Sequence, residues 1–250
     1  MSEPSSKWAT AALFAPATSA SRQAWMVDLL ARLRVLFLLK LVGIPSFIGL
    51  FFIAYFWILR HPVGETTLMP VTSVDRLIGF EFALLPVYLT LWIYVSLAPI
   101  LLADRRELFT YGAAIGTMCM VALALFLVLP SAVPPNLLDA RSGTGMGMLA
   151  GIDASGNACP SLHVAAALFS AVWLGRILRR VGAPALLRVF NWVWCVAIIY
   201  STMAIKQHVA YDVAGGLLLG AIAAWLALRL PALAGYRRAR LRGPVKGEAA

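Results

Sequence analysis

His208 and Asp212 are the residues whose types and spacing most directly suggest chemistry. They lie four residues apart at the start of an apolar stretch, a spacing that puts both on one face of a helix. A carboxylate that accepts the proton of one ring nitrogen fixes the tautomer, frees the other nitrogen for attack and stabilises the resulting cation. A carboxylate in an apolar span also needs a partner, so the spacing predicts either a nucleophilic histidine or a structural pair.

His163 lies in a second segment, ACPSLHVAAAL, that is typical of a helix start. Pro160 suits the first turn, and Ser161 can cap the helix or donate a hydrogen bond there. The amide groups and dipole of a helix amino end favour a phosphate, so we expect Ser161 to bind phosphate. A histidine beside it can protonate a leaving oxygen as general acid. His208 as nucleophile and His163 as acid would allow in-line displacement at one phosphate.

The elements that position these residues are predicted to be membrane-spanning helices. Of 250 residues, 61% are hydrophobic and 13% charged, whereas soluble domains have about 45–50% and about 25%. A spanning helix needs about 20 mostly apolar residues. Six stretches qualify, at about 35–59, 79–103, 110–130, 161–178, 188–205 and 210–229. We therefore predict an all-α, polytopic membrane helical bundle with six transmembrane helices.

The domain organisation follows from these stretches. Residues 31–230 form the six-helix membrane domain, between a mobile cytoplasmic N-terminal tail at 1–30 and a basic cytoplasmic tail at 231–250. Two long connections, at about 60–78 and 131–160, join spans on the same side, and the second is expected to fold back over the bundle.

Basic residues predict the orientation of the bundle. The net charge of +10 comes mainly from arginines before the first span, in alternate loops and in the C-terminal tail. Loops rich in Lys and Arg stay cytoplasmic, so we expect an integral protein of the cytoplasmic (inner) membrane with both termini inside. All three histidines then face the periplasmic or extracellular side. The tail is expected to contact anionic lipid head groups, and nucleic acid is not an expected partner.

The two histidine segments resemble the type 2 phosphatidic acid phosphatase superfamily. The resemblance is carried by PSLH at 160–163 and HVAYD at 208–212, followed by Gly215 and Gly216, and covers roughly residues 75–228. It implies that His208 attacks phosphorus to give a phosphohistidine, while His163 protonates the leaving group and Asp212 supports His208. Water or an alcohol then takes the phosphoryl group, with no metal and no cofactor.

Departures from the family pattern indicate a branch. The lipid phosphatases usually read Pro-Ser-Gly-His where this chain has Leu162, and they carry an arginine where it has Thr202. Leu162, Gln207 and the run LPSAVPPN at 129–136 instead resemble the inositol phosphorylceramide synthase-like branch, which includes phosphoryl-alcohol transferases. The family's first motif is not recognisable, so we expect Arg141 and Lys206, on the correct side, to bind phosphate. Both could equally be interfacial anchors.

The leading hypothesis is a membrane lipid phosphate phosphatase or phosphotransferase that acts on a lipid phosphate or phospholipid. One alternative is a lipid carrier that binds a head group without chemistry, and another is a zinc site of His61, His163 and His208. His61 alone reads as a polar anchor, and three cysteines give no disulfide framework. Asp75 and Arg76 could pair with each other or line a pocket. Lipid identity, hydrolysis or transfer, and oligomeric state stay open.

Overall fold

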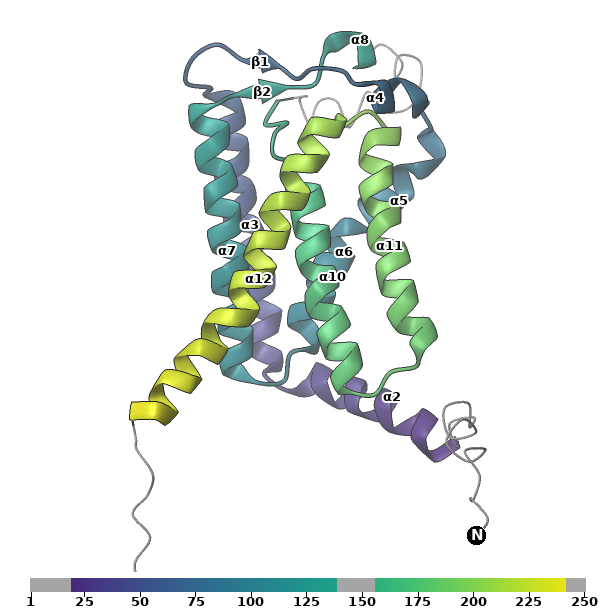
Figure 1. Ribbon diagram of the computed structural model, residues 1–250, viewed down its shortest axis with the longest axis vertical. Coiled ribbons are helices and arrows are strands. Elements are labelled where there is room, and N and C mark those ends of the chain that lie inside the picture. Colours follow the sequence, from purple (N-terminus) through teal and green to yellow (C-terminus); the bar gives the residue numbers. More distant parts are fainter. Residues whose placement is uncertain (1–18, 139–155, 242–250) are drawn as a thin grey trace, which may run out of the picture.

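The fold is a bundle of long apolar helices (Figure 1). The computed structural model describes the backbone of residues 19–138 and 156–241, and the side chains of 24–137 and 156–229. Within this part, six helices are long and apolar enough to cross a membrane, which confirms the predicted all-α polytopic bundle. They are α3 (Phe37–Arg60), the run η1–α5–α6 (Phe82–Leu84, Leu85–Leu89, Leu91–Leu101), α7 (Arg105–Val128), α10 (Leu162–Arg180), α11 (Ala185–Ala204) and α12 (Ala210–Leu241).

Some observed helix ends differ from the predicted ones. Helix α7 begins five residues before the predicted position 110, because the Asp104 carboxylate accepts a hydrogen bond from the backbone N–H of Glu107. Helix α12 runs on to Leu241, past its membrane segment Ala210–Arg229. The first part of the predicted basic tail is therefore helical.

Short elements cover the two ends of the bundle. One end, called the β end below, carries the parallel strands β1 (Thr67–Leu68) and β2 (Ser131–Ala132) with helices α4 (Ser73–Leu77) and α8 (Pro135–Leu138) (Figure 1). Helix α2 (Ser19–Arg34) lies across the opposite end. Residues 19–30, which we expected to be a mobile tail, are thus helical. Helix α2 packs on α6 and is supported by the ion pair between Asp28 and Arg32.

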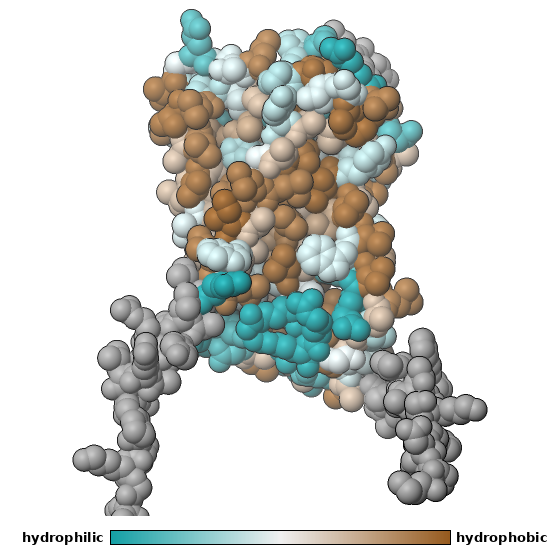
Figure 2. Space-filling view, in the orientation of Figure 1, coloured by the Kyte–Doolittle hydropathy of each residue, from teal (hydrophilic) through white to brown (hydrophobic). Residues whose placement is uncertain are grey.

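Helix α10 stands at the centre of the bundle. Its membrane segment is 67% buried, whereas that of α3 is 6% buried. It packs against α6, α7, α11 and α12, and its residues Phe169, Trp173 and Ile177 belong to the main hydrophobic core. The outward faces of the other helices expose large apolar side chains such as Leu50, Ile53 and Met120, and Figure 2 shows a brown, hydrophobic belt around the bundle. A chain with this surface is an integral membrane protein.

The basic loops gather at the α2 end. Arg105 and Arg106 begin α7, and Arg179, Arg180 and Arg188 lie around the connection from α10 to α11. Figure 2 shows a hydrophilic, teal surface at the lower end of the bundle. Arg180 also forms an ion pair with Glu107 at 2.5 Å, which ties α10 to α7. The amino ends of α10 and α12 lie at the β end, opposite these basic residues. His163 is the second residue of α10, and His208 comes two residues before α12.

Helices α10 and α12 touch backbone to backbone through two glycines. A Cβ added to Gly216 would lie 2.4 Å from the carbonyl oxygen of Ser161, and one on Gly220 would lie 2.6 Å from that of Ala165. Atoms this close must shift, and backbone atoms of a central helix cannot shift easily. The GxxxG spacing therefore provides the close helix packing that such pairs allow in membrane proteins.

Replacing Gly220 with alanine is expected to destabilise the bundle by about 1–3 kcal/mol, because the added methyl group overpacks the contact with Ala165. The matched control is Gly49→Ala on α3, where an added Cβ meets nothing within 4 Å. There alanine should be neutral or slightly stabilising, since it favours a helix more than glycine does. Thermal unfolding of both variants in detergent measures the difference. Equal unfolding temperatures would contradict the close contact.

Candidate active site

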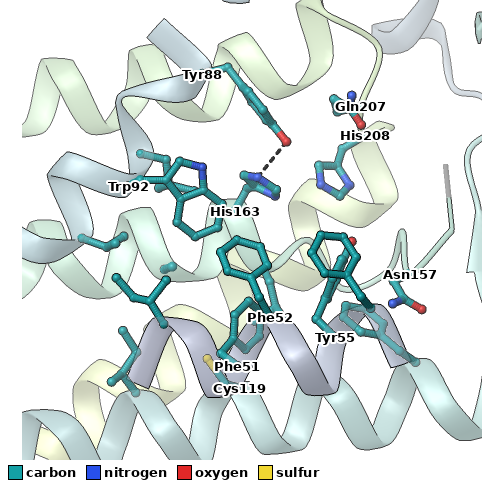
Figure 3. Close-up of a pocket in the computed structure, with 18 of the residues that line it drawn as sticks. Phe51, Phe52, Tyr55, Tyr88, Trp92, Cys119, Asn157, His163, Gln207 and His208 are labelled. Atoms are coloured by element: carbon teal, nitrogen blue, oxygen red, sulfur yellow. Dashed lines mark hydrogen bonds between the residues drawn. The ribbon is translucent and has the colours of Figure 1, made fainter. Parts of the chain in front are cut away.

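A cavity of about 260 Å³ lies between α3, α5, α6, α7 and α10 towards the β end. Most of its wall is aromatic or aliphatic. Its polar side chains gather around the amino ends of α10 and α12, as Figure 3 shows. They are Tyr55, Tyr88, Asn157, His163, Gln207 and His208.

His208 lies in the tight turn between α11 and α12. Its backbone N–H and that of Gln207 both donate to the carbonyl of Thr202, at 3.1 and 2.9 Å. The N–H of Ala210, the first residue of α12, donates to the buried carboxylate of Asp75 at 2.8 Å. His208 therefore precedes the helix that we expected it to open. Its position is fixed by the turn, with hydrogen bonds on both sides of the residue.

Asp212 lies directly behind the His208 ring and is fully buried. Its Oδ2 accepts a hydrogen bond from the N–H of Val209 at 2.9 Å and lies 3.5 Å from Nδ1 of His208. This distance is close enough for an ion pair, but Nδ1 makes no hydrogen bond with a described residue, and neither does Oδ1 of Asp212. The carboxylate thus approaches Nδ1 and leaves Nε2 as the ring nitrogen available to a group in the cavity.

His163 is the second residue of α10 and faces the same cavity. Its Nε2 lies 2.7 Å from the hydroxyl of Tyr88, and the two rings stack with centroids 4.7 Å apart. The Trp92 and His163 rings form a T-shaped contact, with their centroids 5.8 Å apart. The centroids of the two histidine rings are 5.7 Å apart. Both rings line the cavity, so one small group there could contact both.

Tyr88 and Asn157 are site residues that the sequence patterns did not indicate. Tyr88 comes from α5, and a tyrosine near the end of a span ordinarily reads as an interfacial anchor. Asn157 follows the residues that the structure does not describe and has a φ of +53°, a conformation that asparagine tolerates better than most residues. Its Nδ2, like Nε2 of Gln207, is buried without a hydrogen-bond partner among the described residues. Both amides line the cavity beside His208.

The predicted phosphate ligands do not line this cavity where they are described. Ser161 is fully buried, and its hydroxyl accepts the N–H of Val164 at 3.3 Å as the N-cap of α10. Nζ of Lys206 donates to the carbonyl of Asp75 at 3.1 Å and to that of Ile78. Burial lowers the pKa of Lys206, and the nearby Asp75 partly offsets this effect. Arg141 lies outside the described residues.

Asp75 neither pairs with Arg76 nor lines the cavity. It is 3% exposed, and its carboxylate accepts hydrogen bonds from the N–H and the hydroxyl of Thr72, both at 2.7 Å, as well as from Ala210. Helix α4 is thereby attached to the start of α12. Asp75 is thus a positioning residue for the turn that carries His208.

His61 stands apart from the other two histidines. Its ring is exposed, stacks on Trp57 and bonds to the carbonyl of that residue through Nδ1 at 2.7 Å. Within residues 19–138 and 156–241, no three His, Cys, Asp or Glu side chains come close enough together to hold a metal ion. The zinc site considered from the sequence is therefore not assembled by His61, His163 and His208.

The cavity thus combines a histidine backed by a carboxylate, a second histidine held by a tyrosine, and two amides whose nitrogens have no partner among the described residues. These groups can surround one small oxyanion, with a nucleophile on one side and a proton donor on the other. The family model described as the PAP2 superfamily matches residues 108–235, which include His163, His208 and Asp212. Comparison with curated proteins and with solved structures gives no match. The match spans half of the chain and both histidine segments, and the chain therefore belongs to the PAP2 superfamily.

Proposed function

We propose that this protein transfers the phosphoryl group of a lipid phosphate or phospholipid through a phosphohistidine on His208. Membership of the PAP2 superfamily supports a phosphatase or phosphotransferase acting on lipids. The observation that carries the proposal is the pair of histidine rings, 5.7 Å apart at one cavity, with the buried carboxylate of Asp212 behind His208.

In the first step, Nε2 of His208 forms a bond to phosphorus as the bond from phosphorus to the leaving oxygen breaks. His163 gives its proton to that oxygen, which leaves as an alcohol or as the hydroxyl of the lipid. The positive charge that develops on the His208 ring is stabilised by Asp212, which lies 3.5 Å from Nδ1. In the second step, His163 takes a proton from water or an alcohol, whose oxygen attacks phosphorus and frees His208.

The hydroxyl of Tyr88 marks the position proposed for the leaving oxygen. It lies 2.7 Å from Nε2 of His163, the distance at which a substrate oxygen would receive a proton. When substrate enters, the Tyr88 hydroxyl moves aside and a substrate oxygen takes over this hydrogen bond. The amide groups of Asn157 and Gln207 donate to phosphoryl oxygens on the His208 side, and Arg141 remains a further candidate for this contact.

The site is proposed to face the periplasmic or extracellular side, with the lipid in the outer leaflet. Arginine-rich loops at the α2 end support a cytoplasmic location for that end. The β end, with both histidines, would then lie on the other side of the cytoplasmic membrane.

Transfer to an alcohol is the second candidate, and the lining of the cavity favours it. Leu162 and Gln207, two of the features shared with the inositol phosphorylceramide synthase-like branch, both contribute to the cavity wall. A mostly apolar wall limits access of water to a phosphohistidine, which leaves a lipid alcohol as the favoured acceptor.

Phosphate release and head-group exchange by the purified protein test the proposal directly. The substrates are lipid phosphates and phospholipids, assayed with and without an added lipid alcohol and with and without EDTA. We expect turnover that persists in EDTA and an acid-labile phosphoenzyme after rapid quenching. Binding without turnover would instead indicate a carrier, and activity restored only by added metal would contradict the metal-independent mechanism.

A further inference from the structure

A second cavity continues the first towards the α2 end. It measures about 450 Å³ and lies between α3, α6 and α7. Both cavities are lined by Phe47, Ile48, Val95 and Ile115, so they adjoin at these side chains. The second cavity is called the distal cavity below.

The two cavities together follow α3 for most of its length. Their lining on this helix extends from Phe56 to Leu39, which corresponds to about 25 Å at about 1.5 Å per residue. Half of a bilayer's hydrocarbon core is only about 15 Å thick. The joined space therefore extends beyond one leaflet. Its far end lies at the buried Lys40, whose Nζ donates to the carbonyls of Arg32 and Ile100.

Polarity changes sharply along this space. The histidines and amides are at one end, and the first part beyond them is walled by Phe52 and Trp92, whose rings are 4.9 Å apart. Trp92 also touches His163, so this apolar wall begins directly at the proposed acid. A molecule that places an oxyanion between the histidines can extend its remaining atoms along this apolar space.

We propose that the joined cavities hold one hydrocarbon chain of the lipid whose phosphoryl group meets His208. This inference rests on the proposed function, because it uses the histidine end to anchor the head of the same molecule. An apolar path of limited length discriminates between chains. A short chain fills only the space beside Phe52 and Trp92, whereas a long chain passes Phe47 and Ile115 into the distal cavity.

Chain length should therefore control catalytic efficiency. Burial of each methylene group strengthens binding by a factor of about four. For a series of single-chain alkyl phosphates, kcat/KM should rise from octyl through dodecyl to hexadecyl phosphate and level off when the distal cavity is filled.

The variant Gly112→Leu tests this inference by filling the distal cavity. Gly112 lines that cavity from α7, and a Cβ added there meets nothing within 4 Å. The control is Gly49→Leu, which has the same free space but lines neither cavity. We expect the ratio of kcat/KM for hexadecyl over octyl phosphate to fall about tenfold or more in Gly112→Leu, since a leucine displaces two or more methylenes. The ratio should be unchanged in Gly49→Leu, as should octyl phosphate turnover in both variants.

Two results would overturn the inference. One is an unchanged ratio in Gly112→Leu and in a second variant, Gly43→Leu, which enters the same cavity from α3 with equal free space. The other is an equal fall for every chain length in variants whose thermal unfolding matches that of the wild type.

The same series distinguishes a failure of this inference from a failure of the proposed function. If the wild type turns over no alkyl phosphate, displacement of a fluorescent lipid phosphate by the series replaces the activity assay. Binding that strengthens with chain length, and loses this dependence in Gly112→Leu, would support the chain site while the phosphoryl transfer proposal fails. Binding independent of chain length would overturn the chain site.

Discussion

Replacement of His208 by asparagine is expected to reduce kcat/KM by about four orders of magnitude or more and to abolish the phosphoenzyme. Nε2 of this residue is the proposed attacking atom, and removing a nucleophile leaves only the catalysis due to binding and positioning. The fold should persist, because the hydrogen bond to the carbonyl of Thr202 comes from the backbone N–H of residue 208, which the substitution leaves in place. The measurement is single-turnover kinetics with quenching and detection of acid-labile phosphate on the protein.

His61→Asn is the matched control for this prediction. His61 is a histidine on the same chain, but it is exposed and bonds to the carbonyl of Trp57 outside the cavity. Its substitution should leave kcat/KM within about twofold of the wild type, as is usual for surface positions. If the His208 variant retained the phosphoenzyme, or if His61→Asn lost it instead, the assignment of the nucleophile would be wrong.

Substitution of Asp212 by asparagine is expected to reduce kcat by about 10³- to 10⁴-fold, because a neutral amide can neither select the reactive tautomer nor stabilise the imidazolium. Asparagine has the same shape, and its carbonyl oxygen can still accept the N–H of Val209 that Oδ2 accepts at 2.9 Å. The start of α12 should therefore remain intact. Steady-state and single-turnover rates measure the effect, and Asp28→Asn, at the α2 end, should be close to the wild type.

Cys159 provides a second readout of the charge on Asp212, in variants whose thermal unfolding matches that of the wild type. Burial and the negative charge of Asp212 both raise the pKa of this thiol, so less of it is thiolate than in a free cysteine. Removing the charge in Asp212→Asn lowers the pKa and increases the thiolate fraction at mildly alkaline pH. Alkylation of Cys159, followed by site-resolved mass spectrometry, should accelerate. A large loss of kcat with unchanged alkylation would argue against a charged carboxylate at this position.

Hydropathy and residue spacing were sufficient to predict the spanning helices. Each of the six predicted stretches overlaps an observed apolar helix, because about 20 apolar residues have few alternatives to a helix in a membrane. The pairing of His208 with Asp212 was also predictable, since it depends on four residues of local chain. Its geometry was not, because the turn stabilised by Thr202 and Asp75 places His208 before the helix.

The remaining site residues depend on contacts that no local pattern encodes. Tyr88 reaches His163 across 75 positions of sequence, and Asp75 reaches Ala210 across 135. Such contacts depend on how α4 and α5 lie against α10 and α12, which is determined by packing of the whole bundle. Lys206, in contrast, was indicated by the sequence but does not line the cavity. Its charge and its place on the histidine side suggested a phosphate ligand, but its Nζ donates to the carbonyls of Asp75 and Ile78.

The glycine contact between α10 and α12 also bears on how the protein responds to its membrane. Bilayers of different thickness are accommodated by tilting of helices, and helices that pack loosely tilt most readily. Helix α3 is the most exposed of the six spans at 6% buried, while α10 and α12 are held together at Gly216 and Gly220 by backbone atoms. Hydrophobic mismatch would therefore be absorbed mainly by α3, which walls the proposed chain path. The separation of the two histidines would stay the same in thin and thick membranes, so lipid composition would influence which chains enter more than how fast a bound phosphoryl group reacts.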